Sequence, residues 1–446
     1  MDETRRRVVA AMSALGLLGA AGPAFAQAGG AVPAASNATA RRHRRLQGAE
    51  AQALFDAVLA HLPAAQREVL RDPRREVQIA LTRIEREADG SARFATATFG
   101  VQRQRWFPAA SVVKLPIALL VAEVLEAANL GFNARTVLAS APRSGNWEAA
   151  EPLVEPVWQT LWRLLVVSEN VPFNRLYDML GPDRIHARLA ELGFDDVRLI
   201  SRLGSPDPRL NRQTIASRIE APETGPDGEL AWVPRWNAEA RRAAARRFPF
   251  GSALKGAAWQ DDRGRIEQGP RDFSTANFLP LEDAHAMLLR LAFPEATRRS
   301  QRWALSATTR LSLLRITGLF PRESPLLATG THAPASFGDG YAKFFVVGDR
   351  DAAPRGFRSF GKTGEAFGHQ GETALLTEAD GQGEVLLSAN LYANADGVLN
   401  DDRYEYDTVS RPFLAALGRA ALAAEKERPR LHRADAAFLP TVLGMG

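Results

Sequence analysis

The chain has 446 residues, of which 46% are hydrophobic and 24% are charged, and it contains no cysteine. This composition excludes a mainly disordered chain, a disulfide scaffold, a thiol enzyme and a cysteine-ligated metal site. The surface is mixed in charge, because 56 basic residues accompany 51 acidic ones, so nucleic-acid binding is not favoured. Only five of the basic residues are lysines, and a lysine kept among so many arginines can mark a place where an amine must lose its proton.

Residues 1–26 have the pattern of a signal peptide. Three arginines at 5–7 precede an apolar run over 8–21, and Ala24-Phe25-Ala26 fits a cleavage site. The run is too short and too rich in small residues for a stable membrane span. The paired arginines suggest the twin-arginine route, and an ordinary secretory signal fits almost as well. We therefore expect a periplasmic or otherwise exported protein.

The rest of the chain is expected to hold a flexible linker over 27–49, a folded domain over 50–425 and a C-terminal tail over 426–446. Residues 214–273 interrupt the periodic pattern and have the character of an insertion. Strands near both chain ends, with helices between them, indicate an α+β fold whose antiparallel sheet is completed by the two ends. In chain order the pattern predicts a helix over 49–62, strands over 77–85 and 92–101 with a turn at 88–90, helices over 111–127, 157–167, 172–180, 185–192, 281–291 and 301–314, strands over 341–347, 357–362, 372–377 and 384–391, and a closing helix over 408–423.

The first candidate motif is Ser111-Val-Val-Lys114, at the start of the long apolar helix. A spacing of three residues puts the hydroxyl and the amine on one face of a helix. The helix start also offers backbone N–H groups to a developing anion. Burial would lower the pKa of the Lys114 amine and allow it to act as a base. Alone, this motif is common and is usually no more than a helix cap.

Two further motifs follow in order: Ser168-Glu169-Asn170 after a helix, and Lys362-Thr363-Gly364 on a predicted strand. Lys114 and Lys362 are two of the five lysines. Three such motifs in this order, behind an export signal, are far more specific than any one of them.

Together these motifs resemble the serine β-lactamase and penicillin-binding protein superfamily, and most of all the class A β-lactamases. The resemblance covers most of residues 51–425 and includes the approach Phe107–Ser111, the stretch Ser168–Asn174, and Asp207-Pro-Arg-Leu-Asn211, which is similar to the family's omega-loop motif. It implies a β-lactamase/transpeptidase-like fold, in which an antiparallel sheet flanked by helices is joined by an all-α lobe.

The resemblance also implies a role for each matching residue. Ser111 would be acylated, and Lys114 would accept its proton directly or through a water that Asp207 also holds. Ser168 and Lys362 would pass a proton to the leaving nitrogen, and Asp207 with Asn211 would activate the deacylating water. The backbone N–H groups of Ser111 and Glu365 would form the oxyanion hole. The candidate catalytic residues are thus Ser111, Lys114, Ser168, Asp207 and Lys362, and the candidate substrate-binding residues are Asn170, Asn211, Thr363, Gly364 and Glu365.

Four positions depart from the family pattern. Asp207 replaces a glutamate and is one methylene shorter, so we expect slow hydrolysis. Glu169 replaces an aspartate, which keeps the charge. Glu365 stands where small residues are usual and would repel a substrate carboxylate, although Lys362 could offset this. Finally, His369-Gln370 occupy the place of an expected arginine.

The leading hypothesis is an exported serine hydrolase that opens β-lactam amides through an acyl-enzyme on Ser111. The alternatives are a penicillin-binding D,D-peptidase or transpeptidase acting on peptidoglycan stem peptides, and a non-catalytic binding protein on the same fold. The intact motifs argue against the last, since a retired site tends to lose one of them. No cofactor or metal is expected, because the seven histidines show no zinc-ligand spacing. We expect a monomer whose partner is a small β-lactam or peptidoglycan-derived molecule, with no nucleic acid.

Overall fold

The computed structural model describes residues 43–138, 153–205, 207–323 and 337–434. The expected signal peptide, most of the expected linker and the last residues of the expected tail lie outside this part of the chain. Of the described helices, none is both long and apolar enough to cross a membrane.

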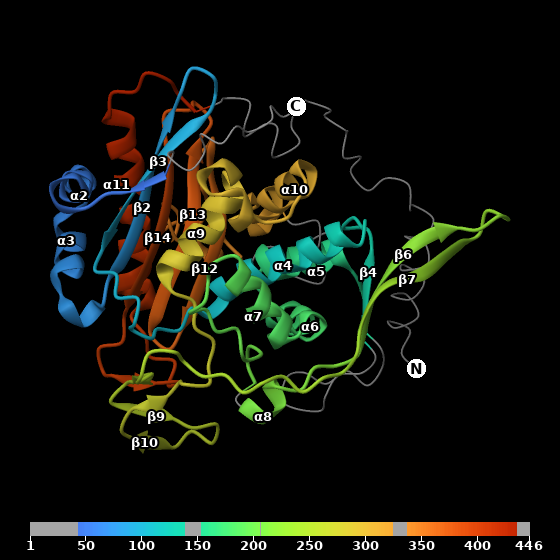
Figure 1. Cartoon of the computed structure of the whole chain (residues 1–446). Coiled ribbons are helices and arrows are strands. Elements are labelled where there is room, and N and C mark those ends of the chain that lie inside the picture. Colours follow the sequence, from blue (N-terminus) through green and yellow to red (C-terminus); the bar gives the residue numbers. More distant parts are fainter. Residues whose placement is uncertain (1–42, 139–152, 206, 324–336, 435–446) are drawn as a thin grey trace, which may run out of the picture.

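A six-stranded sheet in the order β1-β3-β2-β14-β13-β12 forms the centre of the molecule (Figure 1). Strands β2 (Gln78–Arg86) and β14 (Glu384–Tyr392) pair antiparallel, so strands from the two ends of the chain complete one sheet, as predicted. The other strands are β1 (His43–Arg45), β3 (Ala92–Phe99), β13 (His369–Glu378) and β12 (Phe357–Ala366). The last of these, at the edge of the sheet, carries the third motif.

Helices cover both faces of the sheet (Figure 1). On one face lie α2 (Gly48–His61), α3 (Ala64–Arg71) and α11 (Arg411–Glu427), and Phe413 and Leu387 belong to the core that they enclose. The other face meets α9 (Leu281–Ala292) and α10 (Ala307–Gly318). Beyond these, the helical lobe contains α4 (Lys114–Ala127), α5 (Val157–Leu165), α6 (Asn170–Leu180) and α7 (Pro182–Glu191). Helix α4 is apolar on nearly every side because it is buried within this lobe.

Residues 214–273 contribute strands to three small sheets. Strands β6 (Ser217–Thr224) and β7 (Leu230–Ala238) make a hairpin that projects away from the helices (Figure 1) and joins β4 (Arg135–Leu138) and β5 (Leu153–Pro156). The later short strands pack at the lower end of the central sheet in Figure 1. They are β8 (Leu254–Lys255), β9 (Ala258–Gln260), β10 (Ile266–Gln268) and β11 (Arg271–Asp272), and β9 pairs with β15 (Val398–Leu399) near the end of the chain.

Two sequence predictions need correction. The apolar run over 341–347 is not a strand: a short helical turn (Asp339–Tyr341) leads into further turns. Residues 342–347 are buried, and the carboxylate of Glu372 accepts the N–H groups of Phe344 and Phe345 at 2.8 and 2.6 Å. The expected linker over 27–49 is also too long. Its residues 43–45 form β1 beside β3, and α2 begins at Gly48.

Candidate active site

Ser111 lies in a short 3₁₀ turn, Ala110–Val113, that runs directly into α4. The turn passes very close to Gly364 on β12. A Cβ atom at Gly364 would lie 2.6 Å from the Ala109 carbonyl oxygen and 3.1 Å from the Val112 nitrogen. Only glycine therefore allows the edge strand to approach the turn that carries Ser111. Just before the serine, Ala110 has a φ of 44°, a left-handed conformation that is costly for a residue with a side chain.

Lys114 is the central hydrogen-bond donor of the site. Its side chain is fully buried, and its Nζ donates to Ser111 Oγ at 2.8 Å, to Asn170 Oδ1 at 2.9 Å and to the Ser168 carbonyl oxygen at 2.5 Å. Burial, and then the charge of Lys362, lower the pKa of Lys114 well below its ordinary value, against the opposing influence of Glu169. A neutral amine that touches the serine hydroxyl can act as a base toward it.

Ser168 joins the two lysines of the motifs. It lies between α5 and α6 with a φ of 62°, and its Oγ accepts Lys362 Nζ at 2.8 Å and Lys114 Nζ at 3.3 Å. Lys362 is fully buried on β12, and its Nζ also donates to the Thr363 carbonyl oxygen at 3.0 Å. Burial, followed by the charge of Lys343, lowers the pKa of Lys362 to about 7. The motifs thus meet in one hydrogen-bonded chain, Ser111–Lys114–Ser168–Lys362.

A buried pair behind β12 was missed by sequence reasoning. Lys343 is fully buried, donates to the Thr317 carbonyl oxygen and lies 3.5 Å from the carbonyl oxygen of Gly361, the residue before Lys362. Glu372 stands opposite Thr363 in the strand register. Burial lowers the pKa of Lys343 to about 8 and raises that of Glu372. The scarcity of lysine could have singled out Lys343, but nothing in its local sequence placed it behind the site.

Asp207 and Asn211 are not part of this series of hydrogen bonds. Asp207 caps the short helix α8 (Pro208–Asn211): its Oδ1 accepts the Arg209 N–H at 2.8 Å, and Oδ2 lies 3.4 Å from the Arg209 guanidinium. These contacts, the backbone N–H of Arg209 foremost, lower the pKa of Asp207. Asn211 is buried, where it accepts the Arg202 N–H at 3.0 Å and donates to the Ser205 carbonyl oxygen at 2.9 Å. The side-chain amide of Asn211 therefore fixes the backbone of the loop that precedes α8.

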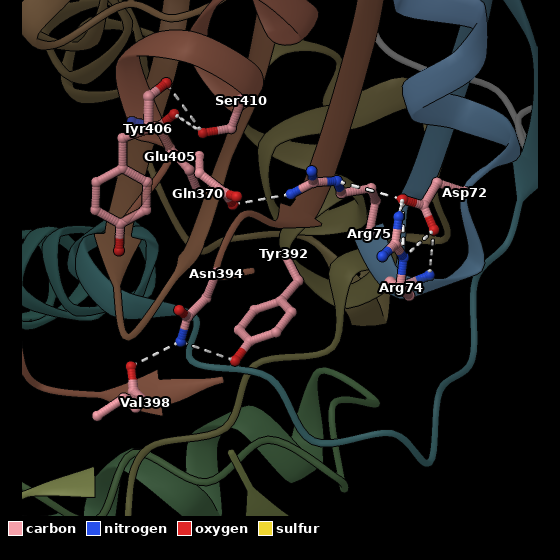
Figure 2. A network of polar contacts seen from close by, with 10 residues as sticks. All are labelled: Asp72, Arg74, Arg75, Gln370, Tyr392, Asn394, Val398, Glu405, Tyr406 and Ser410. Carbon is pink, nitrogen blue, oxygen red and sulfur yellow. Dashed lines mark hydrogen bonds and ion pairs between the residues drawn. The ribbon is translucent and has the colours of Figure 1, made fainter. Parts of the chain in front are cut away.

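Glu365 does not stand beside Thr363 as an unpaired anion. Its carboxylate accepts a hydrogen bond from Gln370 and lies 3.2 Å from Arg411, at the start of α11. Ser410 in turn donates to Gln370 Oε1 at 2.6 Å, which ties the start of this helix to β13 (Figure 2). An arginine from a distant part of the sequence, Arg411, therefore lies beside the end of the third motif. No local pattern could reveal this pairing, because the two residues are 46 positions apart.

The remaining predicted residues lie where the motifs place them. Thr363 is buried on β12, and Asn170, at the start of α6, is tied to Lys114 by its side chain. Glu169, the departure from an aspartate, pairs with Arg163. Within the described residues, no cluster of three or more histidines and carboxylates could hold a metal ion.

A serine, two buried lysines and a second serine, set between a helical lobe and the edge of an antiparallel sheet, define a serine hydrolase of the β-lactamase and penicillin-binding protein type. The sequence profile of the beta-lactamase enzyme family (Beta-lactamase2) matches residues 80–405, and the chain belongs to this family.

Similar solved structures have low sequence identity to this chain. A β-lactamase from Sphaerobacter thermophilus is 17% identical, with a TM-score of 0.44 over 84% of this chain and 99% of its own. PBP-A is 17% identical, with a TM-score of 0.43 over 85% and 97% of the two chains. A β-lactamase from Burkholderia phymatum is 13% identical, with a TM-score of 0.41 over 82% and 99%. No curated protein sequence gives a significant match.

Proposed function

We propose that this protein is a class A-like β-lactamase that hydrolyses β-lactam amides through an acyl-enzyme on Ser111. The observation that carries the proposal is the 2.8 Å hydrogen bond between Lys114 Nζ and Ser111 Oγ, at one end of the chain of contacts that reaches Lys362. A buried lysine with a lowered pKa that touches a serine is the arrangement that an activated nucleophile requires.

The acylation step follows from this geometry. Neutral Lys114 takes the hydroxyl proton as Ser111 Oγ forms a bond to the lactam carbonyl carbon. The backbone N–H groups of Ser111 and Glu365 stabilise the oxyanion. When the C–N bond breaks, Ser168 gives its hydroxyl proton to the nitrogen and takes one from protonated Lys114, whose Nζ lies 3.3 Å from Ser168 Oγ. Lys362 Nζ, 2.8 Å from the same oxygen, holds Ser168 in place for this transfer. Protonated Lys362, with Thr363, receives the substrate carboxylate.

Deacylation is assigned to Asp207, which would accept a proton from the attacking water as that water forms a bond to the acyl carbon. Asp207 is held by Arg209 and, among the described residues, has no hydrogen bond to Ser111 or Lys114. This observation favours a second candidate, a penicillin-binding D,D-peptidase or transpeptidase on peptidoglycan stem peptides. Such an enzyme uses the same acylation groups and does not need fast hydrolysis of a penicilloyl ester.

Intact-protein mass spectrometry after addition of excess benzylpenicillin separates these functions. A β-lactamase gives an adduct of one penicillin mass that decays with product release, and Asp207→Asn makes the adduct persist. A persistent adduct on the unaltered protein supports the peptidase. Ser111→Ala is the control and should give no adduct. An adduct on that variant would remove Ser111 from the mechanism, and unchanged turnover in Asp207→Asn would remove Asp207.

We also propose that the enzyme is exported to the periplasm and acts there as a monomer. The support is the arginine-led apolar segment over 1–26 with its small-residue cleavage site. N-terminal sequencing of the protein recovered from the periplasm should begin near residue 27, and recovery of the uncut chain from the cytoplasm would contradict the proposal. Light scattering on the same sample tests the monomer.

A further inference from the structure

Four arginines line one cleft beside the loop helix α8. Arg209 and Arg212 come from α8 and the residue that follows it, and Arg246 and Arg247 come from the segment that leaves β7. The cleft has a volume of about 170 Å³. Tyr177, Thr275 and several apolar residues complete the wall, and none of the described lining residues is a carboxylate.

Two of these arginines have carboxylate partners just outside the cleft. Arg246 forms an ion pair with Asp183, and Arg209 makes a long contact of 3.4 Å with Asp207. Arg212 and Arg247 pair with no carboxylate of the described residues. They donate instead to neutral oxygens: Arg212 to the Ala243 carbonyl oxygen at 2.9 Å, and Arg247 to Ser274 Oγ at 3.3 Å. Four cations against two carboxylates leave a local charge of +2.

The backbone fixes the two segments that carry these arginines. Ala243 N donates to the Arg212 carbonyl oxygen at 2.7 Å, and Thr214 N donates to the Arg241 carbonyl oxygen at 2.8 Å. Gln213 and Arg242 form a β-bridge between the same segments. This ladder fixes the two backbone segments whose arginines line the cleft, and an anion bound there would be attracted to both.

We propose that this arginine cleft (Arg209, Arg212, Arg246 and Arg247) binds the phosphate group of an anionic ligand. A phosphate monoester or pyrophosphate carries about the charge that the cleft leaves uncompensated, and its oxygens match the paired N–H groups of guanidinium. The volume admits one or two phosphate groups with little else, so any larger portion of the ligand lies outside the cleft. The same chemistry could come from a soluble phosphate compound or from a phosphate headgroup on a lipid.

Isothermal titration of inorganic pyrophosphate into the full chain, at constant ionic strength, tests the site. We expect saturable binding with one site per chain, weakened at least tenfold in Arg212→Gln/Arg247→Gln. The matched control is Arg241→Gln/Arg242→Gln, which removes the same charge from exposed arginines that do not line the cleft. Equal melting temperatures for the two double variants exclude unfolding as the cause. Equal weakening in both would mean that only overall charge matters, and would overturn the proposal.

Sedimentation with phosphatidylcholine vesicles, with and without phosphatidic acid, identifies the source of the phosphate group. Retention on phosphatidic acid that is lost in Arg212→Gln/Arg247→Gln and kept in the control supports a lipid headgroup. Pyrophosphate binding without vesicle retention supports a soluble phosphate compound. Absence of both kinds of binding would overturn the proposal.

Discussion

The contact between Gly364 and the turn that carries Ser111 gives the sharpest quantitative prediction. In Gly364→Ala the new Cβ would lie 2.6 Å from the Ala109 carbonyl oxygen, where ordinary contact begins at 3.4 Å. The difference, about 0.8 Å, must be taken up by movement of β12 or of the turn. The atoms it meets include backbone, and the Val112 N–H already bonds Ala109 at 2.9 Å, so neither side yields easily.

A displacement of about 1 Å in an active site can lower the rate about 100-fold, which is about 2.7 kcal/mol in the activation free energy. We therefore expect Gly364→Ala to reduce the second-order rate constant for acylation by benzylpenicillin 10- to 100-fold. Overpacking should lower the free energy of unfolding by about 1–3 kcal/mol.

Stopped-flow acylation and thermal unfolding measure these two effects. Gly225→Ala is the matched control, because its new Cβ would meet nothing closer than 3.7 Å and its backbone is not left-handed. If Gly364→Ala acylates at the rate of the unaltered protein and melts at the same temperature, the close approach of β12 to Ser111 is not required, and the geometric argument fails.

Three further substitutions test the charges of Lys343 and Glu365 and the hydrogen bonds of Asn211. Replacing Lys343 with Met removes a positive charge that helps to lower the pKa of Lys362, so the pKa of Lys362 should rise. The alkaline limb of the kcat/KM profile, expected near pH 7 for the unaltered protein, should therefore move to higher pH. A limb at the same pH in both proteins would contradict this coupling between the two lysines. Glu365→Ala breaks a partly exposed ion pair worth about 0–1 kcal/mol and leaves Arg411 with the exposed Asp407 as its remaining carboxylate partner among the described residues. A substrate carboxylate can then compete for Arg411, so the KM for penicillins should fall by up to about fivefold. An unchanged KM would place this pair away from the substrate. Asn211→Ala removes one buried and one partly buried hydrogen bond of this side chain, and we expect the free energy of unfolding to fall by about 1–3 kcal/mol, measured by thermal unfolding. Unchanged stability with slower deacylation would instead support a role for Asn211 in positioning the water.

Much of the fold could be predicted because its signals are local. The alternating runs that became β2 and β3, and the continuous apolar run that became α4, contain their own periodicity. The central sheet followed from the occurrence of strands at both chain ends. Likewise, the contact between Ser111 and Lys114 is a property of spacing within one turn.

The features that were missed depend on pairs distant in sequence. An apolar run at 341–347 has the pattern of a strand, but the Glu372 carboxylate accepts two of its N–H groups, which are then not available to a neighbouring strand. Glu365 reads as an unexplained anion until the fold brings Arg411 beside it. Local periodicity contains no information about either partner.

In the proposed reaction, the residues for acylation are held in place by more hydrogen bonds than the carboxylate for deacylation. The acylation groups are held by several mutual hydrogen bonds among buried lysines, so they need little rearrangement when substrate arrives. The deacylation carboxylate of Asp207 is instead held by Arg209, which also lines the arginine cleft. An anion bound there would compete with Asp207 for the guanidinium and weaken that hold. If both proposals are correct, pyrophosphate should speed the decay of the penicilloyl adduct in the unaltered protein and leave the decay in Asp207→Asn unchanged. If titration shows that pyrophosphate binds but the rate of adduct decay does not change, the two sites are independent.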